Sequence, residues 1–478
     1  MTTTNRDAIA GNGVQGGHLT LDGRDLVALA GEYGSPLFVF SERRLRANAA
    51  AFLAAARNGH PSSTVCYASK ACSNIHVLKI LRSEGLAIEV NSGGELHKAL
   101  YAGFAPSEIV FNGVSKSTTE LDWSIELGIK AINVDSVFEL ERIARLAHAR
   151  SARAKVSLRL VPSLTGGAFA SIQTGNAKTK FGMTQADLPE LLRLLAAHSQ
   201  ALDPVGLHLH IGSQVAETAS FLGAVEFAAG AAATLAAAIG RPFAHVNLGG
   251  GYPIEYRHRR GNDPVLERYG APERAATMVE AVAAAMSRKL SGDTELLFEP
   301  GRAIVGDTAV LLSRVENQKH RGEQPWLYLD AGYNMLLDLA VTRWYYHMAT
   351  ANRADEAART EFRLVGPLCD SADCFYDTEG EYLLPKLQQR FGMDLDEALT
   401  ADILHLPPTR AMAASTAPGD LVAIFDVGAY TLSEMFTYCG RPRAAAVMVK
   451  LDGSIASLRR RDSYQDLLAQ EMEPADRA

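Results

Sequence analysis

The feature that most constrains the fold of this chain is a regular alternation of short apolar runs with helix-like segments. Eight runs have the composition of buried strands: 64–69, 86–90, 108–112, 131–135, 155–160, 206–211, 245–249 and 295–299. Seven helix-like segments separate them: 75–84, 94–101, 117–126, 136–149, 185–198, 218–239 and 273–290. Strands that are apolar on both faces are typical of parallel sheets covered by helices. Eight such units in about 250 residues predict a (β/α)8 TIM barrel, with a doubly wound open sheet as the alternative.

The rest of the chain has a different pattern. From about residue 311 the apolar runs are strand-rich and lack regular helical spacers, and the early runs 18–23 and 36–40 have the same character. We expect a second, mainly β domain of the sandwich or barrel type. Our boundaries give residues 36–310 to the barrel, and residues 1–35 and 311–478 to the β domain. Segment 387–418 is predicted to be an insert of one helix followed by a loop.

Composition excludes several functional classes. The formal net charge of −7 does not favour nucleic acid or an anionic membrane as a partner. No apolar run approaches the roughly 18–20 residues that span a bilayer, and the polar first 18 residues lack the apolar core of a secretory signal. The five cysteines lack CxxC spacing, so we expect free thiols, no metal site and a cytoplasmic protein.

The predicted strand ends carry reactive side chains. In barrel enzymes the chemistry lies at the carboxyl ends of the strands, where chance alone would place mostly turn residues. Here the ends carry an unusual set of charged and polar groups: Lys70, Glu89, Asn112, Asp135, Arg159, His208, His210, Gly249, Gly250, Gly251, Glu299 and Arg302. We therefore expect these groups to meet in one barrel mouth.

Four of these features have two interpretations each when taken alone. A partly desolvated Lys70 would form a Schiff base with an aldehyde, or it would make a structural ion pair. The glycines of LGGGYP (248–253) would let backbone N–H groups approach a phosphate, or they would form a mobile turn. Glu299 would meet a ring nitrogen, or pair with Arg302. The histidines of HLHIG would bind zinc, for which a third ligand is not evident, or one would stack on a ring.

Pyridoxal 5′-phosphate (PLP) unites the four features, because it has an aldehyde, a phosphate, a pyridine nitrogen and a flat ring. An acid at the nitrogen keeps it protonated and makes the ring an electron sink. This chemistry is suited to stabilising a carbanion after a bond at the α-carbon breaks.

The motifs resemble those of the alanine-racemase-fold (type III) PLP-dependent decarboxylases, specifically the diaminopimelate decarboxylase-like group that includes ornithine and lysine decarboxylases of this fold. The resemblance runs from about residue 36 to 465. It implies that Lys70, in YASKAC, is the Schiff-base lysine and that His210, in HIGSQ, stacks on the ring. It further implies that LGGGYP binds the phosphate and that EPGR supplies three contacts: Glu299 to the pyridine nitrogen, and Gly301 and Arg302 to the cofactor, with Arg302 also near the substrate.

The same resemblance assigns roles in the second domain. GPLCDSAD (366–373) is similar to the segment that holds a proton-donating cysteine, here Cys369, followed by a substrate-reading acid, here Asp370. DVGAYT and RPR are similar to the C-terminal motif whose tyrosine, here Tyr430, contacts cofactor and substrate. In the implied reaction the substrate amine displaces Lys70, CO₂ leaves, and Cys369 protonates the carbanion. The family's cysteine loop comes from the neighbouring subunit, which implies a homodimer with shared active sites.

The chain departs from typical diaminopimelate decarboxylases at two places. Glu89 replaces an aspartate and would still contact the cofactor site. Asp338 and Thr342 stand where the typical enzyme has an arginine and a tyrosine that hold the distal carboxylate of the substrate. An acid at this point favours a distal ammonium, as in ornithine or lysine. The alternative is that Asp338 faces solvent and that Arg343 binds a carboxylate.

Other classes predict different observations. A decarboxylase of a larger amino-acid conjugate, in siderophore or antibiotic biosynthesis, would use the insert 387–418 as a lid. An amino-acid racemase of this fold would place an arginine where Glu299 stands. A non-catalytic PLP-binding protein would not need Lys70 and Cys369, and a metal-dependent hydrolase would have no near-visible absorbance. A decarboxylase of the diaminopimelate, ornithine or lysine class, with a place in amino-acid metabolism such as lysine biosynthesis, is the main prediction.

Overall fold

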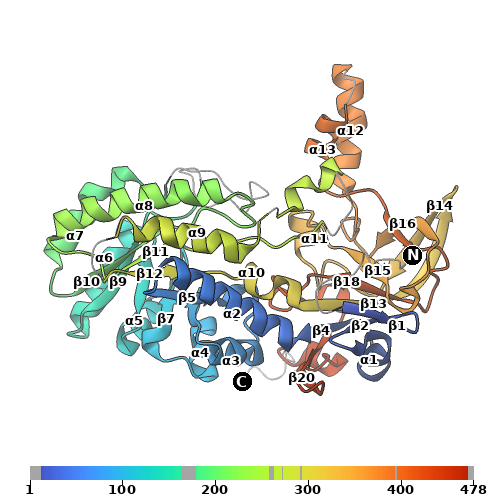
Figure 1. The fold of residues 1–478 in the computed structure, drawn as a ribbon, viewed down its shortest axis with the longest axis horizontal. Coiled ribbons are helices and arrows are strands. Elements are labelled where there is room, and N and C mark those ends of the chain that lie inside the picture. Colours follow the sequence, from blue (N-terminus) through green and yellow to red (C-terminus); the bar gives the residue numbers. More distant parts are fainter. Residues whose placement is uncertain are drawn as a thin grey trace. The chain divides into compact units, whose positions relative to one another are not determined.

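The computed structural model describes residues 12–162, 179–257, 263–271, 273–290, 293–392 and 396–471. It divides into two compact units. The barrel unit contains residues 45–254 and 271–306, and the β unit contains residues 1–44, 255–270 and 307–478. Figure 1 follows the chain through both.

Eight parallel strands form a closed barrel, which confirms the predicted TIM barrel and excludes the doubly wound sheet. The order around the barrel is β10-β11-β12-β5-β6-β7-β8-β9, and β12 pairs with β5 to close it. The strands are β5 (Ser63–Ala68), β6 (Ala87–Val90), β7 (Ile109–Phe111), β8 (Ala131–Val134), β9 (Ala154–Arg159), β10 (Leu202–His208), β11 (His245–Asn247) and β12 (Glu295–Phe298). All eight overlap the predicted runs.

The seven predicted helices are also present on the outside of the barrel (Figure 1). They are α3 (Ile75–Ser83), α4 (Gly93–Ala102), α5 (Thr118–Leu127), α6 (Val137–Ala149), α7 (Leu188–Ala197), α8 (Thr218–Ile239) and α9 (Ala275–Ser287). An unpredicted alanine-rich helix, α2 (Glu42–Gly59), precedes the first barrel strand, and the short α10 (Arg302–Val305) follows the last.

Local capping sequences determine where several barrel helices begin and end. The hydroxyls of Ser92, Ser117 and Ser136 accept hydrogen bonds from backbone N–H groups in the first turns of α4, α5 and α6. Gly103 and Gly128 end α4 and α5 in the left-handed conformation. Ser92 and Ser136 lie two residues after β6 and β8, so these strand ends are linked closely to the helices that cover them.

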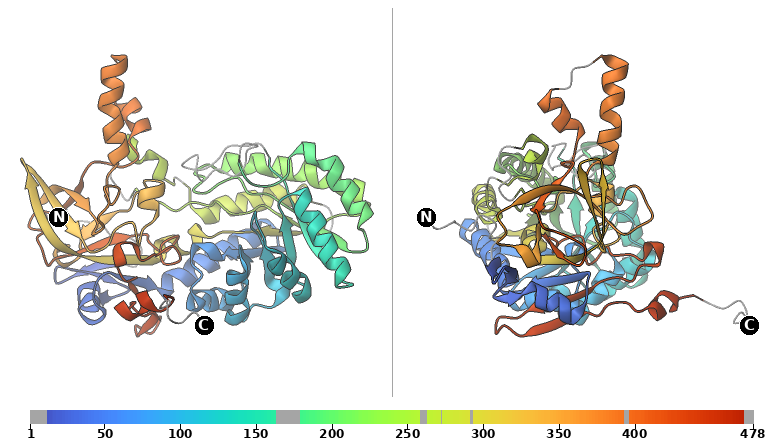
Figure 2. Two further views of the ribbon diagram at one scale, coloured as in Figure 1. Left: turned by 180° about the vertical axis from the view of Figure 1, so that it is seen from behind. Right: turned by 90° about the vertical axis from the view of Figure 1, so that its right-hand side faces the viewer.

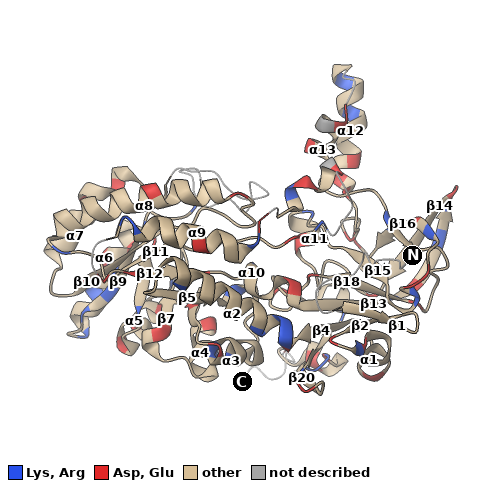
Figure 3. Cartoon of the chain, viewed as in Figure 1, with Lys and Arg blue, Asp and Glu red and all other residues tan. Residues whose placement is uncertain are grey.

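Helix α8 corrects one sequence expectation. By length and composition it would qualify to cross a membrane, and it is the one helix among the described residues to do so. Its sole charged residue is Glu226, and Figure 3 shows the helix largely uncharged. However, α8 connects β10 to β11, and its Phe221, Val225 and Leu235 are buried. We therefore interpret it as an outer helix of the barrel whose exposed face consists mainly of small residues.

The β unit contains the predicted mainly β domain. One path through its nine-stranded sheet is β17-β16-β14-β13-β4-β19-β20, and β18 pairs with β13 and β15. The strands are β4 (Leu37–Ser41), β13 (Ala309–Arg321), β14 (Gln324–Leu329), β15 (Met348–Thr350), β16 (Arg359–Val365), β17 (Arg410–Ala413), β18 (Leu421–Phe425), β19 (Ala445–Val449) and β20 (Ile455–Arg459). A small sheet precedes it, formed by β1 (Asn12–Gln15), β2 (His18–Leu21) and β3 (Arg24–Asp25).

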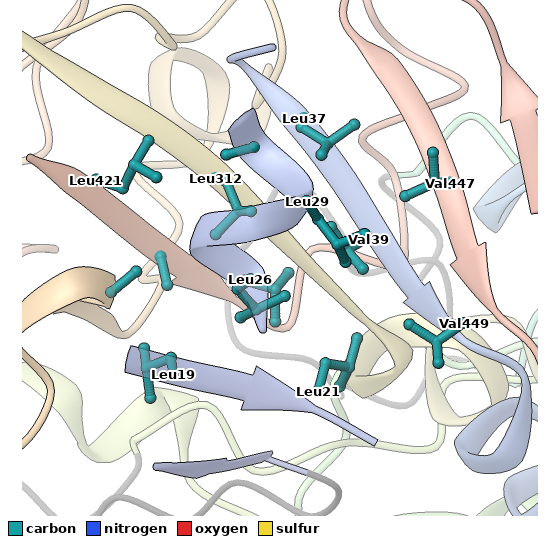
Figure 4. Close-up of a cluster of buried hydrophobic side chains, with 14 of the residues drawn as sticks. Leu19, Leu21, Leu26, Leu29, Leu37, Val39, Leu312, Leu421, Val447 and Val449 are labelled. Atoms are coloured by element: carbon teal, nitrogen blue, oxygen red, sulfur yellow. The ribbon is translucent and has the colours of Figure 1, made fainter. Parts of the chain in front are cut away.

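The core of the β unit is an apolar cluster beneath the helix α1 (Leu26–Tyr33) (Figure 4). Side chains from β2, α1, β4, β13, β18 and β19 meet there, including Leu19, Leu26, Val39, Leu312, Leu421 and Val447. Burial of each Leu or Val side chain contributes roughly 1.5–3 kcal/mol relative to exposure. The cluster therefore joins the N-terminal strands to strands from the end of the chain.

Two boundary expectations differ from the structure. Residues 37–41 form β4, which pairs with β13 and β19 in the sheet of the β unit, so the barrel unit does not begin at residue 36. Residues 255–270 lie within the predicted barrel span but belong to the β unit. Neither difference was visible in the sequence pattern, because pairing partners distant along the chain determine both.

The predicted insert is only partly as expected. The predicted single helix is two helices: α12 (Thr378–Phe391), which begins before the insert, and α13 (Glu397–Ile403). Figure 2 shows α12 projecting from its own unit. Residues 393–395 lie outside the described residues. The part predicted to be a loop also contains β17, which pairs antiparallel with β16. Residues 410–413 therefore belong to the sheet.

Candidate active site

Lys70 lies immediately beyond the end of β5, in the short 3₁₀ helix Ser69–Ala71. The residue is exposed in the isolated chain. Its charge nevertheless acts on two groups at the barrel mouth. It opposes the effect of burial on the pKa of Glu89, and it adds to the effect of burial in lowering the pKa of His210. Lys70 therefore faces the mouth.

Two buried carboxylates lie at the ends of different strands. Glu89 is on β6, and Glu299 follows β12 directly. Burial raises the pKa of Glu89, the charge of Lys70 opposes this shift, and the charge of Glu299 adds to it. Burial alone would also raise the pKa of Glu299, but the charge and hydrogen bond of His208 and the amide of Asn247 outweigh it and hold that pKa below its usual value. Of the two acids, Glu299 is the one that stays ionised.

Three buried asparagine side chains surround Glu299, and we call them the amide cradle: Asn112, Asn133 and Asn247. Asn112 donates to Glu299 Oε2 at 3.0 Å, while Asn133 and Asn247 donate to Oε1 at 3.3 and 2.7 Å. The Asn112 amide also donates to Glu89 Oε1 at 2.8 Å. One carboxamide thus links the two buried acids.

The histidines of the HLHIG segment have different partners. His208 Nε2 lies 3.1 Å from Glu299 Oε2, and burial lowers the pKa of this imidazole. His210 Nδ1 accepts the backbone N–H of Gly250 at 3.1 Å. The pair therefore does not converge on one point as a zinc site requires. His210 instead connects its strand end to the glycine loop.

The glycine triplet 249–251 is tightly packed against neighbouring strand ends. A Cβ at each position would lie 2.1–2.4 Å from a backbone carbonyl oxygen, that of Leu209, Glu299 or Gly212. Gly249 and Gly251 also have φ angles of +67° and +103°. The glycines are therefore required by packing, and the interpretation as a mobile turn is not favoured. The N–H of Gly249 donates to Asn247 Oδ1 at 2.9 Å, so this amide joins the loop to Glu299.

The EPGR segment turns into α10 directly after Glu299. Gly301 packs so closely that a Cβ would lie 3.0 Å from that of Ala71, beside Lys70. Arg302 is the first residue of α10 and is buried. The backbone N–H of Ala68 donates to the Pro300 carbonyl at 3.0 Å. These contacts place the lysine segment and the EPGR segment side by side.

Two further strand-end residues form a buried ion pair. Arg159 Nη1 lies 3.4 Å from Asp135 Oδ1, and Gly182 donates its N–H to the same carboxylate oxygen. Because the two charges pair with each other, we interpret Arg159 and Asp135 as structural residues that hold neighbouring strand ends together at the barrel mouth.

The β unit holds the other predicted site residues on loops. Cys369 is exposed, and Asp370 is half-buried beside it. Asp370 accepts the Ala372 N–H at 2.9 Å and the Tyr333 hydroxyl at 2.8 Å, and these two bonds lower the pKa of its carboxyl. The buried carboxylate of Asp373 accepts the N–H groups of Tyr333 and Leu368. Asp373 therefore fixes the loop that carries Cys369.

Asp338 and Arg343 lie around the short helix α11 (Asp338–Val341), and Tyr430 lies after β18 with a φ angle of +56°. The hydroxyl of Thr342 donates back to the Asp338 carbonyl at 3.0 Å. Arg343 donates to the carbonyls of Leu339 and Ala340, and its Nε lies 3.6 Å from the buried Asp377 carboxylate. Arg343 is therefore already engaged within the β unit.

The barrel mouth fits the chemistry of PLP. It combines an exposed lysine, an acid that His208 and buried amides keep ionised, and a glycine loop in which a Cβ would collide with backbone. These groups match the aldehyde, the protonated ring nitrogen and the phosphate, respectively. The fold and the site together define a barrel enzyme that uses pyridoxal phosphate.

Comparison with known proteins agrees with this class. Residues 46–306 match the family described as the pyridoxal binding domain of pyridoxal-dependent decarboxylases. The chain is 32% identical over 459 residues to diaminopimelate decarboxylase of Methanothermobacter thermautotrophicus, and the alignment covers 96% of each protein. It is 33% identical over 455 residues to the Pseudomonas aeruginosa enzyme, covering 95% of this chain and 96% of that enzyme. The crystal structure of diaminopimelate decarboxylase from M. jannaschii matches with a TM-score of 0.82 at 27% identity, covering 98% of both chains.

The chain belongs to the family of PLP-dependent decarboxylases, in its diaminopimelate decarboxylase-like group. It is an amino-acid decarboxylase that uses pyridoxal phosphate.

Sequence reasoning missed two members of the site. Asn133 and Asn247 both lie within otherwise apolar strands, in AINV and HVN. A carboxamide in a buried strand needs hydrogen-bond partners, and this was the signal that could have identified them. Their common partner, Glu299, could be assigned only from the closed barrel.

Proposed function

We propose that this enzyme removes the α-carboxylate of a diamino acid whose distal end carries an ammonium group, as in ornithine or lysine. The bound cofactor supplies an electron sink for the pair of electrons left at the α-carbon. The observation that carries the preference for a distal ammonium is the engagement of Arg343 by Asp377 and by two backbone carbonyls.

The barrel residues have separate tasks in this proposal. Lys70 binds the cofactor through its amine and releases it to the substrate. Glu299 accepts a hydrogen bond from the protonated ring nitrogen, and the buried amides around it support its negative charge. His210 lies against the ring, and the glycine loop with Gly301 and Arg302 holds the phosphate end. Glu89 lies near Lys70 at the cofactor site, where burial and the charge of Glu299 raise the pKa of its carboxyl.

Two residues of the β unit complete the reaction. Cys369 delivers a proton to the α-carbon after CO₂ has left, and its exposure on a fixed loop supports this role. Tyr430 contacts cofactor and substrate. We infer that the Cys369 loop acts in a partner copy, in a cytoplasmic homodimer with shared active sites.

The charges around the proposed distal pocket support the choice of substrate. Asp370 is held ionised by its hydrogen bonds and offers a carboxylate to an ammonium group. Asp338 adds a second acid at the position where a distal carboxylate would need a cation. To bind a carboxylate, Arg343 would have to leave the buried Asp377, which would lose its nearby cation and retain the backbone N–H groups of Gly380 and His405.

A second candidate is meso-diaminopimelate, whose decarboxylation would place the enzyme in lysine biosynthesis. The observation that favours it is the full-length similarity to diaminopimelate decarboxylases. In that case a cation outside α11 would bind the distal carboxylate.

The test is a substrate panel with purified, PLP-loaded enzyme. The D- and L-forms of ornithine and lysine, and meso-diaminopimelate, are supplied separately, and the released CO₂ and amine product are quantified. We expect turnover of ornithine or lysine, and we expect Asp370→Asn to raise KM for that substrate. Efficient turnover of diaminopimelate alone would overturn the proposal of a distal ammonium and support the second candidate.

A further inference from the structure

The amide cradle stabilises an acid without neutralising it. Its three carboxamides donate to Glu299 from three strand ends, and each asparagine is almost completely buried. His208 Nε2 lies 3.1 Å from the same carboxylate, and burial lowers the pKa of its imidazole, so Glu299 has this histidine as well as the three amides beside it. Neutral N–H donors leave the negative charge of Glu299 available to the protonated ring nitrogen of the cofactor.

We propose that Asn112, Asn133 and Asn247 are positioning residues that keep Glu299 ionised and hold its carboxylate in the orientation that meets the protonated ring nitrogen of the cofactor. This inference rests on the proposed role of Glu299 and adds the residues that sustain it.

Second hydrogen bonds determine which way the amides face. The Asn112 Oδ1 accepts from the Asn133 amide at 2.7 Å, and the Asn247 Oδ1 accepts the Gly249 N–H at 2.9 Å. Since these two carbonyl oxygens already have donors, the NH₂ groups of Asn112 and Asn247 are directed at carboxylates. These two amides are therefore oriented before any ring nitrogen arrives.

Each asparagine also has a different second connection. Asn112 contacts Glu89, whose pKa responds to the charge of Lys70. Asn247 contacts the glycine loop, and Asn133 contacts Asn112. Loss of any one asparagine removes a donor from Glu299, but the additional effect differs. Loss of Asn112 also affects the surroundings of Lys70, and loss of Asn247 also affects the glycine loop that holds the phosphate. Loss of Asn133 affects neither of these directly.

The experiment uses the full-length enzyme loaded with PLP, without substrate. Asn112→Leu, Asn133→Leu and Asn247→Leu are compared with the unmodified enzyme by titrating the near-visible absorbance of the cofactor against pH. Removing a donor raises the pKa of Glu299, so the acid-side midpoint of the titration should move to higher pH, by about one unit for one hydrogen bond to a charged group. Asn133→Leu, which loses the longest contact, should move it least.

Cofactor affinity provides a second measurement that separates the three residues. Equilibrium dialysis of PLP should show the largest loss for Asn247→Leu, about tenfold beyond Asn133→Leu, because the glycine loop loses its acceptor as well. Asn112→Leu should instead change the rate at which hydroxylamine removes the cofactor from Lys70.

Asn91 offers a matched control. Its amide donates to Glu89 and Glu95 but is not among the donors to Glu299, so Asn91→Leu should leave the acid-side midpoint in place. The three cradle substitutions should also lose their common shift in a Glu299→Gln background.

Two results would overturn the proposal: cradle variants that titrate like Asn91→Leu, or a shift that persists without Glu299, which would indicate a structural role. If a leucine variant does not fold, the nearly isosteric Asn247→Asp replaces it and should raise the midpoint further, because two adjacent carboxyls share a proton. No substrate enters this titration, so failure of the substrate proposal would leave its outcome unaffected.

Discussion

The barrel unit and the β unit hold their site residues in different ways. In the barrel, Glu89 and Glu299 are buried and bonded to side chains from several strands. In the β unit, Cys369 and Asp370 are exposed or half-buried on a loop fixed by one buried acid, Asp373. The difference suggests that the barrel is built to preserve one chemistry, whereas the β unit presents side chains that can change with the substrate. The predictions below test this contrast, from the largest expected effect to the smallest.

Lys70→Ala should abolish decarboxylation and the near-visible absorbance of the bound cofactor, because the amine that binds the aldehyde is missing. Absorbance spectra and CO₂ release measured on the same preparation check both losses. Retention of full turnover by this variant would contradict the assignment of the cofactor to the barrel mouth.

Cys369→Ala should leave the cofactor absorbance intact and lower kcat by about 10²–10⁴-fold, the usual contribution of a general acid. The measurement is the rate of amine formation, with the spectrum as the control for cofactor binding. A lost spectrum would mean that the β unit holds the cofactor as firmly as the barrel does, and the contrast between the units would fail.

Lys116→Met should destabilise the barrel unit. Lys116 is buried, lies 3.0 Å from Glu139 Oε2, and donates to the carbonyls of Gly113 and Asn133. Removing it leaves a buried carboxylate unpaired, at a cost of about 3–5 kcal/mol in the free energy of unfolding. Chemical denaturation measures the change.

The matched control for Lys116→Met is Arg460→Met in the β unit, where the Arg460–Asp466 pair is at the surface. This control should leave the denaturation midpoint unchanged. Equal effects of the two substitutions would show that burial does not distinguish the two ion pairs.

His245→Phe should flatten the acid side of the stability profile. Burial lowers the pKa of His245 to about 4, against about 6.5 when unfolded. Below pH 6.5 the imidazole is protonated in the unfolded chain but stays neutral in the native chain. The contribution of His245 to the free energy of unfolding is therefore full above pH 6.5 and falls as the pH drops towards 4. The pKa difference corresponds to about 3 kcal/mol, and His245→Phe should not show this loss of stability at low pH.

Denaturation series between pH 4 and 7 measure this slope. His148, an exposed histidine on α6, provides the control: His148→Gln should retain the slope of the unmodified enzyme. An unchanged slope in His245→Phe would mean that other groups cause the acid sensitivity of the barrel.

Much of the fold could be predicted because the barrel strands and helices are encoded locally. Strands such as 87–90 and 109–111 are short apolar runs, and serine caps precede several helices. The pairing of β4 with β13 and β19 could not be predicted, since it joins segments far apart in the sequence. For the same reason the sequence pattern predicts a loop where β17 pairs with β16.

The site shows the same division. Lys70, Glu299 and the glycine loop were identified because their residue types are unusual at strand ends. The amide cradle was not, because asparagines acquire their role only from the closure of the barrel around Glu299. The exposure of Lys70 in the isolated chain could not be predicted, since a residue pattern does not give the accessibility of one side chain.

The position of β4 has a consequence for how the protein is made. Residues 37–41 leave the ribosome early, yet their neighbours in the sheet are residues 309–312 and 445–449. At typical synthesis rates the strand waits on the order of half a minute for its last neighbour. During that interval the apolar residues of β4 lack their native neighbours, so this strand is exposed to non-native pairing until the end of the chain is made.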